Sequence, residues 1–235
     1  MTNKIIKVDR VRSASEAVAL EDLGATMIAV DLAENERFAD HRTLTVEQAA
    51  GITGALRTAT VVAAMDLTGG KPSRLVEAAK RVGATHVQPL INAVPPPPVR
   101  SALRDARLGI VYAGIEISHD DDPGWIFSGH DEYPDLGAAL FQVDVLAEYR
   151  DAWQFLRDES PEYPEEFQIG DLNALAGDRL ILVTLDFTPV NIREIVTKLP
   201  GTAGISLVLG EQASRSDLHF HSYRDALGAL AALRD

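Results

Sequence analysis

Residues 4–9 read Lys4-Ile5-Ile6-Lys7-Val8-Asp9, a short apolar run that ends in a carboxylate. Short runs rich in Val and Ile are typical of buried β-strands. The carboxyl ends of parallel strands meet at one edge, so acids in these positions share one rim if the sheet is parallel. Five further strand-like runs end in the same way, at Asp31, Asp66, Glu116, Asp144 and Asp186.

Helical patterns separate these runs. They are expected at residues 15–23, 46–56, 73–82, 98–107, 166–175, 191–199 and 222–233. Together with the runs that end at Asp9, Asp31 and Asp66, strands are expected at 85–91, 108–116, 138–144, 179–186 and 204–209, which makes eight. Strands that alternate with helices along a whole chain indicate a parallel sheet with helices outside. The sequence therefore predicts an α/β fold, a single-domain (β/α)8 TIM barrel over residues 1–235, with an open doubly wound sheet as the alternative.

Two stretches interrupt the alternation, after the fifth and the sixth strand. Residues 118–137 are rich in Gly, Pro and Asp, so the outer helix there is expected to be short or missing. Residues 145–179 contain an amphipathic pattern at 146–156, which predicts an extra helix. Long insertions at a barrel rim are commonly lids or binding loops. A dimer contact through Trp153 and Phe155 is the alternative.

Composition restricts the class of protein. The chain has 235 residues, a net charge of −13 and no cysteine. A nucleic-acid partner would require a basic face, and no apolar segment reaches the length of a membrane span, so neither partner is expected. Without cysteine there is no disulfide and no sulfur-ligated metal. We expect a cytoplasmic protein, monomer or homodimer, that acts on a small molecule without a cofactor.

Alternation along the strands predicts which side chains face the inside of the barrel. All six terminal acids have the inward parity. Lys7 and Gln88 share it, as do Tyr112 and Gly114 on the fifth strand. Barrel active sites lie at the carboxyl end of the strands, so the set indicates a functional site.

Six carboxylates around one mouth repel one another unless something compensates them. Local cations are one possibility, and Lys7, Arg10, Arg12 and Arg42 are candidates. A cationic substrate is a second. A divalent metal is a third, for which His119 or the alternating pair His219 and His221 would be ligands. No third ligand is fixed by the sequence, and no metal is assigned.

Five motifs follow the chain in the order found in phosphoribosylanthranilate isomerase, the barrel enzyme of tryptophan synthesis. Residues 6–9 stand where that family has Lys-Ile-Cys-Gly, and residues 41–49 resemble its Pro-Arg-Tyr-Val-Ser-Pro-Glu-Gln-Ala. Residues 85–88 resemble its Val-Gln-Leu-His, residues 142–144 its Leu-Leu-Asp, and residues 188–192 its Thr-Pro-Glu-Asn-Val. The chain thus resembles a divergent member of that family, which implies the same barrel.

The resemblance also implies roles for three residues. Asp144 matches the family's acid and Arg42 its carboxylate-binding arginine, while Asp9 occupies the position of its cysteine base. An Asp pair across the barrel resembles the histidine-pathway sugar isomerase, which runs the same type of reaction. The family's glycine-rich phosphate loops have no counterpart at 145–148, 185–186 or 208–210. A phosphorylated substrate is therefore not expected.

The sequence thus predicts an isomerase-like or cyclase-like enzyme that moves protons on a small carboxylate- or amine-bearing substrate. Asp9 and Asp144 are the predicted base and acid, because two carboxylates in different surroundings can differ in proton affinity. A metal-dependent lyase or aldolase, or a non-catalytic binding protein on an isomerase scaffold, are the alternatives. The predicted substrate-binding residues are Lys7, Asp31, Arg42, Asp66, Gln88, Glu116 and Asp186.

Overall fold

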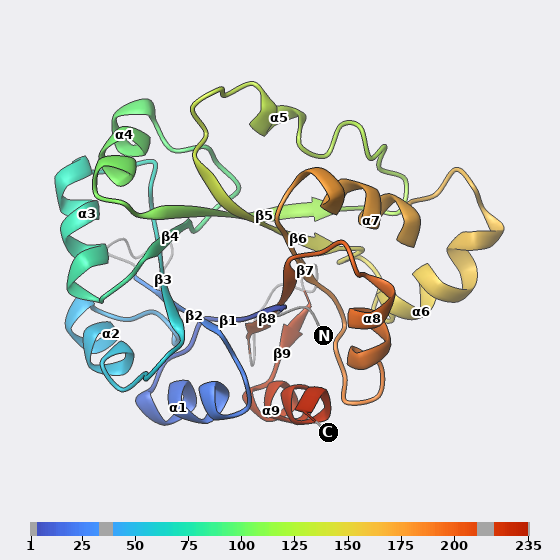
Figure 1. Ribbon diagram of the computed structural model, residues 1–235, viewed down its shortest axis with the longest axis horizontal. Coiled ribbons are helices and arrows are strands. Elements are labelled where there is room, and N and C mark those ends of the chain that lie inside the picture. Colours follow the sequence, from blue (N-terminus) through green and yellow to red (C-terminus); the bar gives the residue numbers. More distant parts are fainter. Residues whose placement is uncertain (1–3, 33–39, 211–218, 235) are drawn as a thin grey trace.

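The strands form a closed ring in the computed structural model, which describes residues 4–32, 40–210 and 219–234 (Figure 1). They are β1 (Ile5–Asp9), β2 (Met27–Asp31), β3 (Thr60–Met65), β4 (His86–Pro89), β5 (Gly109–Ile117), β6 (Ala138–Val145), β7 (Ile181–Thr184) and β8 (Gly204–Leu209). All neighbours pair in parallel, in sequence order. The predicted eight-stranded barrel is confirmed, and the open sheet is wrong.

The ring closes where β1 meets β8. Five residue pairs join the two strands, from Ile5 with Gly204 to Asp9 with Val208. A Cβ atom on Gly204 would lie 1.9 Å from the carbonyl oxygen of Ile5, so only glycine allows this approach. A short ninth strand, β9 (Phe220–His221), pairs with the outer end of β8.

Helices surround the ring. They are α1 (Ala14–Asp22), α2 (Val46–Thr53), α3 (Pro72–Arg81), α4 (Pro97–Asp105), α5 (Ser128–Asp131), α6 (Ala152–Gln154), α7 (Ile169–Asp178), α8 (Ile192–Lys198) and α9 (Tyr223–Arg234). Side chains cap several of them: Ser13 accepts from the Glu16 amide at the start of α1, and Thr45 and Gln48 form a capping box on α2. All seven predicted outer helices are present.

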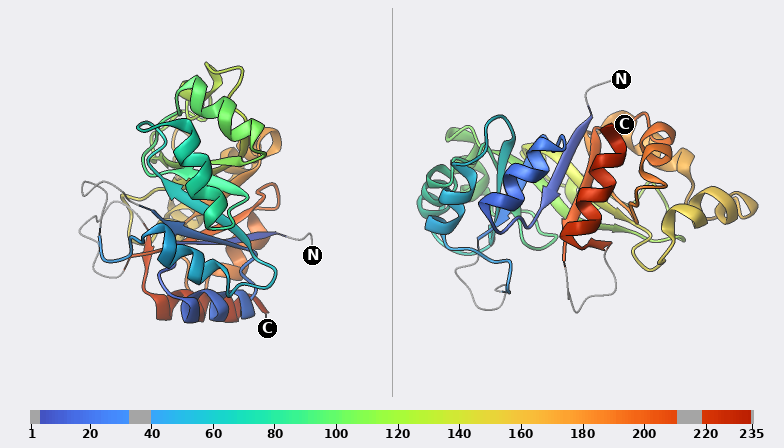
Figure 2. Two further views of the ribbon diagram at one scale, coloured as in Figure 1. Left: turned by 90° about the vertical axis from the view of Figure 1, so that its left-hand side faces the viewer. Right: turned by 90° about the horizontal axis from the view of Figure 1, so that it is seen from below.

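The prediction for the first insertion agrees with the structure, and the prediction for the second does not. As expected, α5 is only four residues long. The helix predicted at residues 146–156 is wrong: Leu146 has a left-handed φ of 55°, and α6 spans three residues before a π-helical turn at Phe155–Glu159. This segment extends to one side of the barrel (Figure 2). Trp153 and Phe155 are 2% and 7% exposed, so these side chains are packed inside the protein and cannot form the alternative dimer contact.

The core has two parts. A small cluster fills the barrel interior, formed by Met27, Ala29, Val62, Val111, Leu140 and Leu182. A much larger cluster lies between the strands and the outer helices. The interior cluster has the parity expected on every strand except β5.

On β5 the predicted inward position of Tyr112 is wrong. Val111 faces the interior, and Tyr112 packs outside the ring against Phe141 and His130. The register with β6 shifts between Tyr112 and Ile115, around Gly114 at φ 79°. This bulge reverses the alternation, so that Glu116 still reaches the mouth of the barrel.

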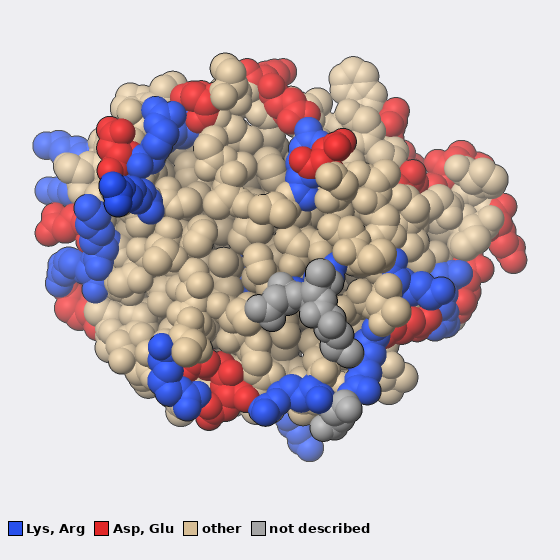
Figure 3. All heavy atoms as spheres, viewed as in Figure 1, with Lys and Arg blue, Asp and Glu red and all other residues tan. Residues whose placement is uncertain are grey.

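The charges on one face of the molecule are mixed. In Figure 3 basic and acidic side chains lie side by side around its edge, and its centre is largely uncharged. That face has no extended basic area of the kind that nucleic acids require. Within the described ranges, no helix has the length and apolar character needed to cross a bilayer.

Candidate functional site

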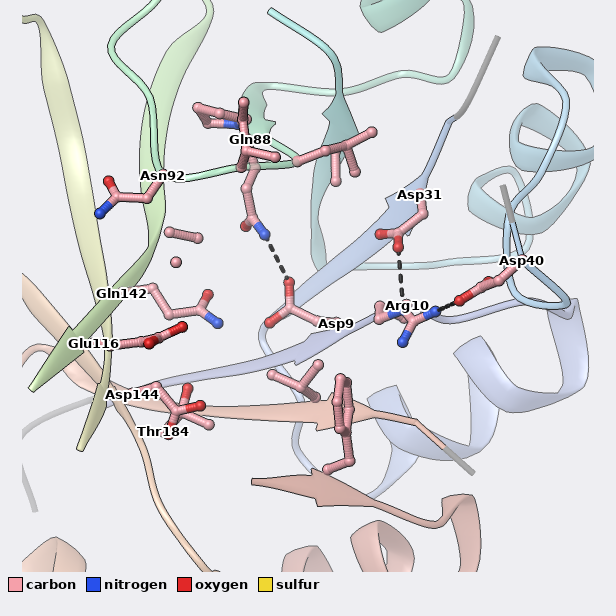
Figure 4. Close-up of a pocket in the computed structure, with 18 residues that line it drawn as sticks. Asp9, Arg10, Asp31, Asp40, Gln88, Asn92, Glu116, Gln142, Asp144 and Thr184 are labelled. Carbon is pink, nitrogen blue, oxygen red and sulfur yellow. Dashed lines mark hydrogen bonds and ion pairs between the residues drawn. The ribbon is translucent and has the colours of Figure 1, made fainter. Parts of the chain in front are cut away.

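A cavity of about 450 Å³ opens at the carboxyl end of the strands (Figure 4). Polar side chains from β1, β2, β4, β5, β6 and β7, and from the adjoining loops, face into it. The labelled residues that line it are Asp9, Arg10, Asp31, Asp40, Gln88, Asn92, Glu116, Gln142, Asp144 and Thr184. The predicted site residues Asp9, Asp31, Gln88, Glu116 and Asp144 are thus brought to one cavity.

Asp9 is held in place by three side chains. Lys7 pairs with its Oδ1, the Ser206 hydroxyl donates to its Oδ2 at 2.5 Å, and Gln88 donates to Oδ1 at 3.4 Å. Lys7 is completely buried beneath the cavity and also donates to Gln142 at 2.7 Å. Burial lowers the pKa of Lys7, although the charge of Asp9 opposes this effect. The result is a fixed carboxylate at the floor of the cavity.

Asp144 has a different partner. Its Oδ1 accepts from His219 Nδ1 at 2.7 Å, and the His219 amide lies 3.4 Å from Oδ2. Burial disfavours a charged imidazole, but the hydrogen bond and the charge of Asp144 together raise the pKa of His219. His219 itself lines a neighbouring cavity of about 570 Å³. Asp144 therefore lies between the central cavity and a histidine behind it.

Arg10 is the cation at the cavity wall. Its Nε donates to Asp31 at 3.2 Å and its Nη2 pairs with Asp40. The pKa of Asp31 is raised to about 6, mainly by burial; the nearby Asp9 contributes to the rise, and the charge of Arg10 opposes it. Asp31 can thus exchange a proton near neutral pH.

Arg42 does not line this cavity. Its guanidinium is fully buried and donates to the carbonyl oxygen of Arg10 at 3.0 Å and to Glu16 at 3.2 Å. Leu44 pairs with Leu32 in a parallel bridge, and Arg42, two residues before Leu44, forms an ion pair with Glu16 on α1. Arg42, to which the resemblance gives the role of carboxylate binder, thus bonds to α1 and to the segment before it instead of facing the cavity.

Asp66 and Asp186 also lie outside the central cavity, because β3 and β7 end before them. Asp66 accepts from the amide and the hydroxyl of Thr68 at 2.9 and 2.6 Å, and faces a groove between α2 and α3. Asp186 accepts from the Trp153 amide at 2.9 Å and lines the cavity of His219.

The two alternating histidines have separate surroundings. His219 Nδ1 is bonded to Asp144, while burial lowers the pKa of His221 to about 4 and favours its neutral form. His119 pairs with Glu148 at 3.3 Å. Among residues 4–32, 40–210 and 219–234, no group of three or more His, Asp or Glu has the arrangement of a metal site.

Sequence reasoning named Arg10 among the candidate cations of the mouth but left it out of the predicted substrate-binding set, and it missed His219 as the partner of Asp144. Arg10 directly follows Asp9, and its left-handed φ of 65° was not visible in the pattern. The position of His219, after the eighth strand, was a signal that it lies near the rim.

Comparison with solved structures supports the fold. Phosphoribosylanthranilate isomerase from Thermus thermophilus is 17% identical, with a TM-score of 0.63 and 98% of each chain covered. The enzyme from Pyrococcus furiosus is 14% identical, with a TM-score of 0.65 and the same coverage. Tryptophan synthase subunit alpha from Legionella pneumophila is 10% identical, with a TM-score of 0.62, and the match covers 98% of this chain and 91% of that one.

No protein-family model matches the sequence, and the comparison with curated proteins gives no match. The resemblance to phosphoribosylanthranilate isomerases drawn from the motifs is confirmed for the fold, over almost the full length. At these identities the likeness establishes the barrel and its strand order.

Proposed function

We propose that this protein is an isomerase-like or cyclase-like enzyme that transfers protons on a small carboxylate-bearing substrate. The observation that carries the proposal is the pair of carboxylates from β1 and β6 that line one cavity with different partners. Asp9 pairs with an ammonium, and Asp144 with an imidazole. Two acids in different surroundings can hold different protonation states, which proton transfer requires.

Asp9 is the proposed base. Asp9 lines the cavity beside the buried Lys7, so that its carboxylate can accept a proton from a substrate bound there. Ser206 and Gln88 fix the orientation of its two oxygens. A positioned base of this kind contributes on the order of 10²–10⁴ to a rate.

Asp144 is the proposed acid, and His219 supplies its proton. A charged His219 can pass a proton along the 2.7 Å bond to Asp144, which donates it to a second substrate atom in the cavity. One proton leaves the substrate to Asp9 and one enters from Asp144, so the substrate formula is unchanged. Exchange with water then restores both groups.

Arg10 is the proposed carboxylate binder, in the role that the resemblance gave to Arg42. Arg10 is the one basic side chain among the described residues that line the cavity. Asp31, Asp40 and Glu116 are acidic side chains that line it as well. A phosphate dianion would be repelled by these acids. A monocarboxylate, alone or with an amine that the acids can bind, fits this distribution. Asp31, Gln88 and Glu116 complete the proposed substrate-binding set, while Lys7, buried beneath the cavity, positions Asp9.

The test is a turnover assay on a panel of amino acids, aromatic acids and small hydroxy or keto acids. Asp9→Asn and Asp144→Asn are each expected to abolish turnover. Circular dichroism checks that each variant is folded under the assay conditions, because Asp9→Asn leaves the buried Lys7 without its counter-charge. Thermal-shift measurements on the same panel report binding. Turnover retained in both variants would overturn the assignment.

A non-catalytic binding protein is the second candidate. It is favoured by the tight bonding of Asp9, whose two oxygens are both engaged by side chains of the protein. This candidate predicts a thermal shift with a carboxylate, no turnover of any panel member, and no dependence of binding on Asp144. The metal-dependent lyase or aldolase predicts that a chelator abolishes turnover, whereas the proton-transfer enzyme is unaffected.

A further inference from the structure

A second, larger cavity lies outside the barrel, between α2 and α3 at the ends of β2 and β3. Its volume is about 780 Å³. The side chains that form its apolar floor are Leu32, Leu44, Met65, Leu75, Ala78 and Leu90. Apolar surface of this extent in a concave site is typical of small-molecule binding. We call this cavity the α2–α3 groove.

The acids on the rim of the groove are bonded to other side chains, whereas two of its cations have no ion-pair partner within the ranges that the structure describes. Of the acids, Glu47 is bonded to Arg81 at 2.5 Å, and Asp66 accepts two hydrogen bonds from Thr68 in its own loop. Lys71 and Arg74 line the groove, are exposed, and have no ion-pair partner among the described residues. Two cations without an ion-pair partner in the described part of the chain thus lie beside apolar side chains of the groove.

We propose that the α2–α3 groove is a binding site for a hydrophobic carboxylate, a single negative charge on an apolar body. The apolar body would cover the leucines of the floor, and the carboxylate would pair with Lys71 and Arg74. An arginine presents a planar fork to a carboxylate, and a neighbouring lysine adds a point charge. Burial of apolar surface supplies most of the affinity, and the two cations select the charge.

The groove is distinct from the central cavity. Among the described residues, Leu90 is the one that lines both the groove and the central cavity. None of the proposed catalytic side chains faces the groove. The proposal therefore does not depend on the proton-transfer function. Leu90 also means that a ligand in the groove contacts one wall of the central cavity.

The test is a titration of the full chain with octanoate, in which amide NMR signals report binding. Octanoate is expected to shift the amide signals of Leu75 and Ala78 on α3. The double variant Lys71→Glu/Arg74→Glu is expected to weaken binding by about tenfold or more, since both attractive charges become repulsive. Octan-1-ol, which lacks the charge, is expected to bind wild type about tenfold more weakly.

Lys80→Glu is the matched control. Lys80 is exposed on the same helix but does not line the groove, so this variant is expected to bind octanoate within about twofold of wild type. Arg74→Ala is a milder variant, used if the double variant unfolds, and is also expected to bind more weakly. Equal octanoate affinity in wild type and Arg74→Ala, or shifts confined to residues outside the groove, would overturn the proposal.

Discussion

The ion pair of Lys7 and Asp9 is the residue-scale feature on which the proposed site depends. Both groups are almost completely removed from water, and each is the other's counter-charge. Breaking such a pair leaves one charge buried without compensation, which commonly costs about 3–5 kcal/mol. The sequence placed both residues on one strand with inward parity, and it identified them as site residues.

Lys7→Met is therefore expected to lower the free energy of unfolding by about 3–5 kcal/mol. The double variant Lys7→Met/Asp9→Asn removes both charges and is expected to lose less than the single variant. Urea denaturation of the four proteins of the cycle measures the coupling. A Lys7→Met single variant as stable as wild type would contradict the buried pair.

Asp31 adds a pH dependence of stability. Its pKa in the fold is about 6, above the value of about 3.9 for an unfolded Asp. The folded state thus binds the proton more tightly, so this contribution is full below about pH 4 and is lost as pH rises through about 6. Asp31→Asn is expected to raise the free energy of unfolding at pH 7 by on the order of 1–2 kcal/mol, with little effect at pH 4.

Urea titrations of wild type and Asp31→Asn at both pH values measure this difference. Arg10→Lys serves as a control, because it keeps the positive charge beside Asp31. An equal change at pH 4 and pH 7 in Asp31→Asn would show that the carboxyl does not titrate in this range.

The hydrogen bond of His219 to Asp144 adds a pH dependence of the same sign as that of Asp31. The pKa of His219 is raised above that of an unfolded histidine, so the pair stabilises the fold fully below about pH 6.5 and less as pH rises through the folded pKa. Asp144→Asn is expected to lower the pKa of His219, measured by NMR of the imidazole nitrogens. His86, whose pKa is lowered by burial alone, is the internal control and should not move. An unchanged His219 would show that Asp144 does not control it.

At the scale of elements, the bulge on β5 positions one wall of the site. Gly114 has a φ of 79°, and a Cβ atom there would lie 3.2 Å from the Asn92 amide nitrogen. Gly114→Ala is expected to cost about 1–3 kcal/mol through backbone strain and to displace Glu116. Gly51→Ala is the control: it lies within α2 with open space around it, so it is expected to stabilise the protein by about 0.5–1 kcal/mol. Thermal denaturation of both variants checks the contrast, and equal effects would contradict it.

Elements with a strong repeating pattern were predicted well, and irregular ones were not. The strand at 204–209 agrees with the structure at both ends, because alternation specifies it locally. The helix predicted at 46–56 begins at Val46 as expected, because the Thr45 cap specifies its start, but it ends at Thr53. The bulge at Gly114 and the left-handed Leu146 depend on tertiary packing, which no local pattern encodes. The bulge at Gly114 reversed the parity of Tyr112, and the left-handed Leu146 shortened the helix expected at 146–156.

At the scale of the whole molecule, the barrel was predictable because eight βα units have few ways to close. Closure of the barrel brings the strand-end acids to one rim. The acids that lie within the observed strands line the cavity. Asp66 and Asp186 lie outside it because β3 and β7 end before them, and Arg42 because its side chain pairs with Glu16 on α1. Charge alone did not distinguish these residues from Asp9 and Asp144.

The central claim is that Asp9 and Asp144 transfer protons to and from a small carboxylate in one cavity. Incubation of the carboxylate panel with the protein in D2O, read by mass spectrometry, tests it directly, because proton transfer at a carbon introduces deuterium even without net turnover. We expect deuterium incorporation into at least one carboxylate with wild type and none with Asp9→Asn or Asp144→Asn. Incorporation with both variants at the wild-type rate, or none with any of the three proteins, would contradict the claim.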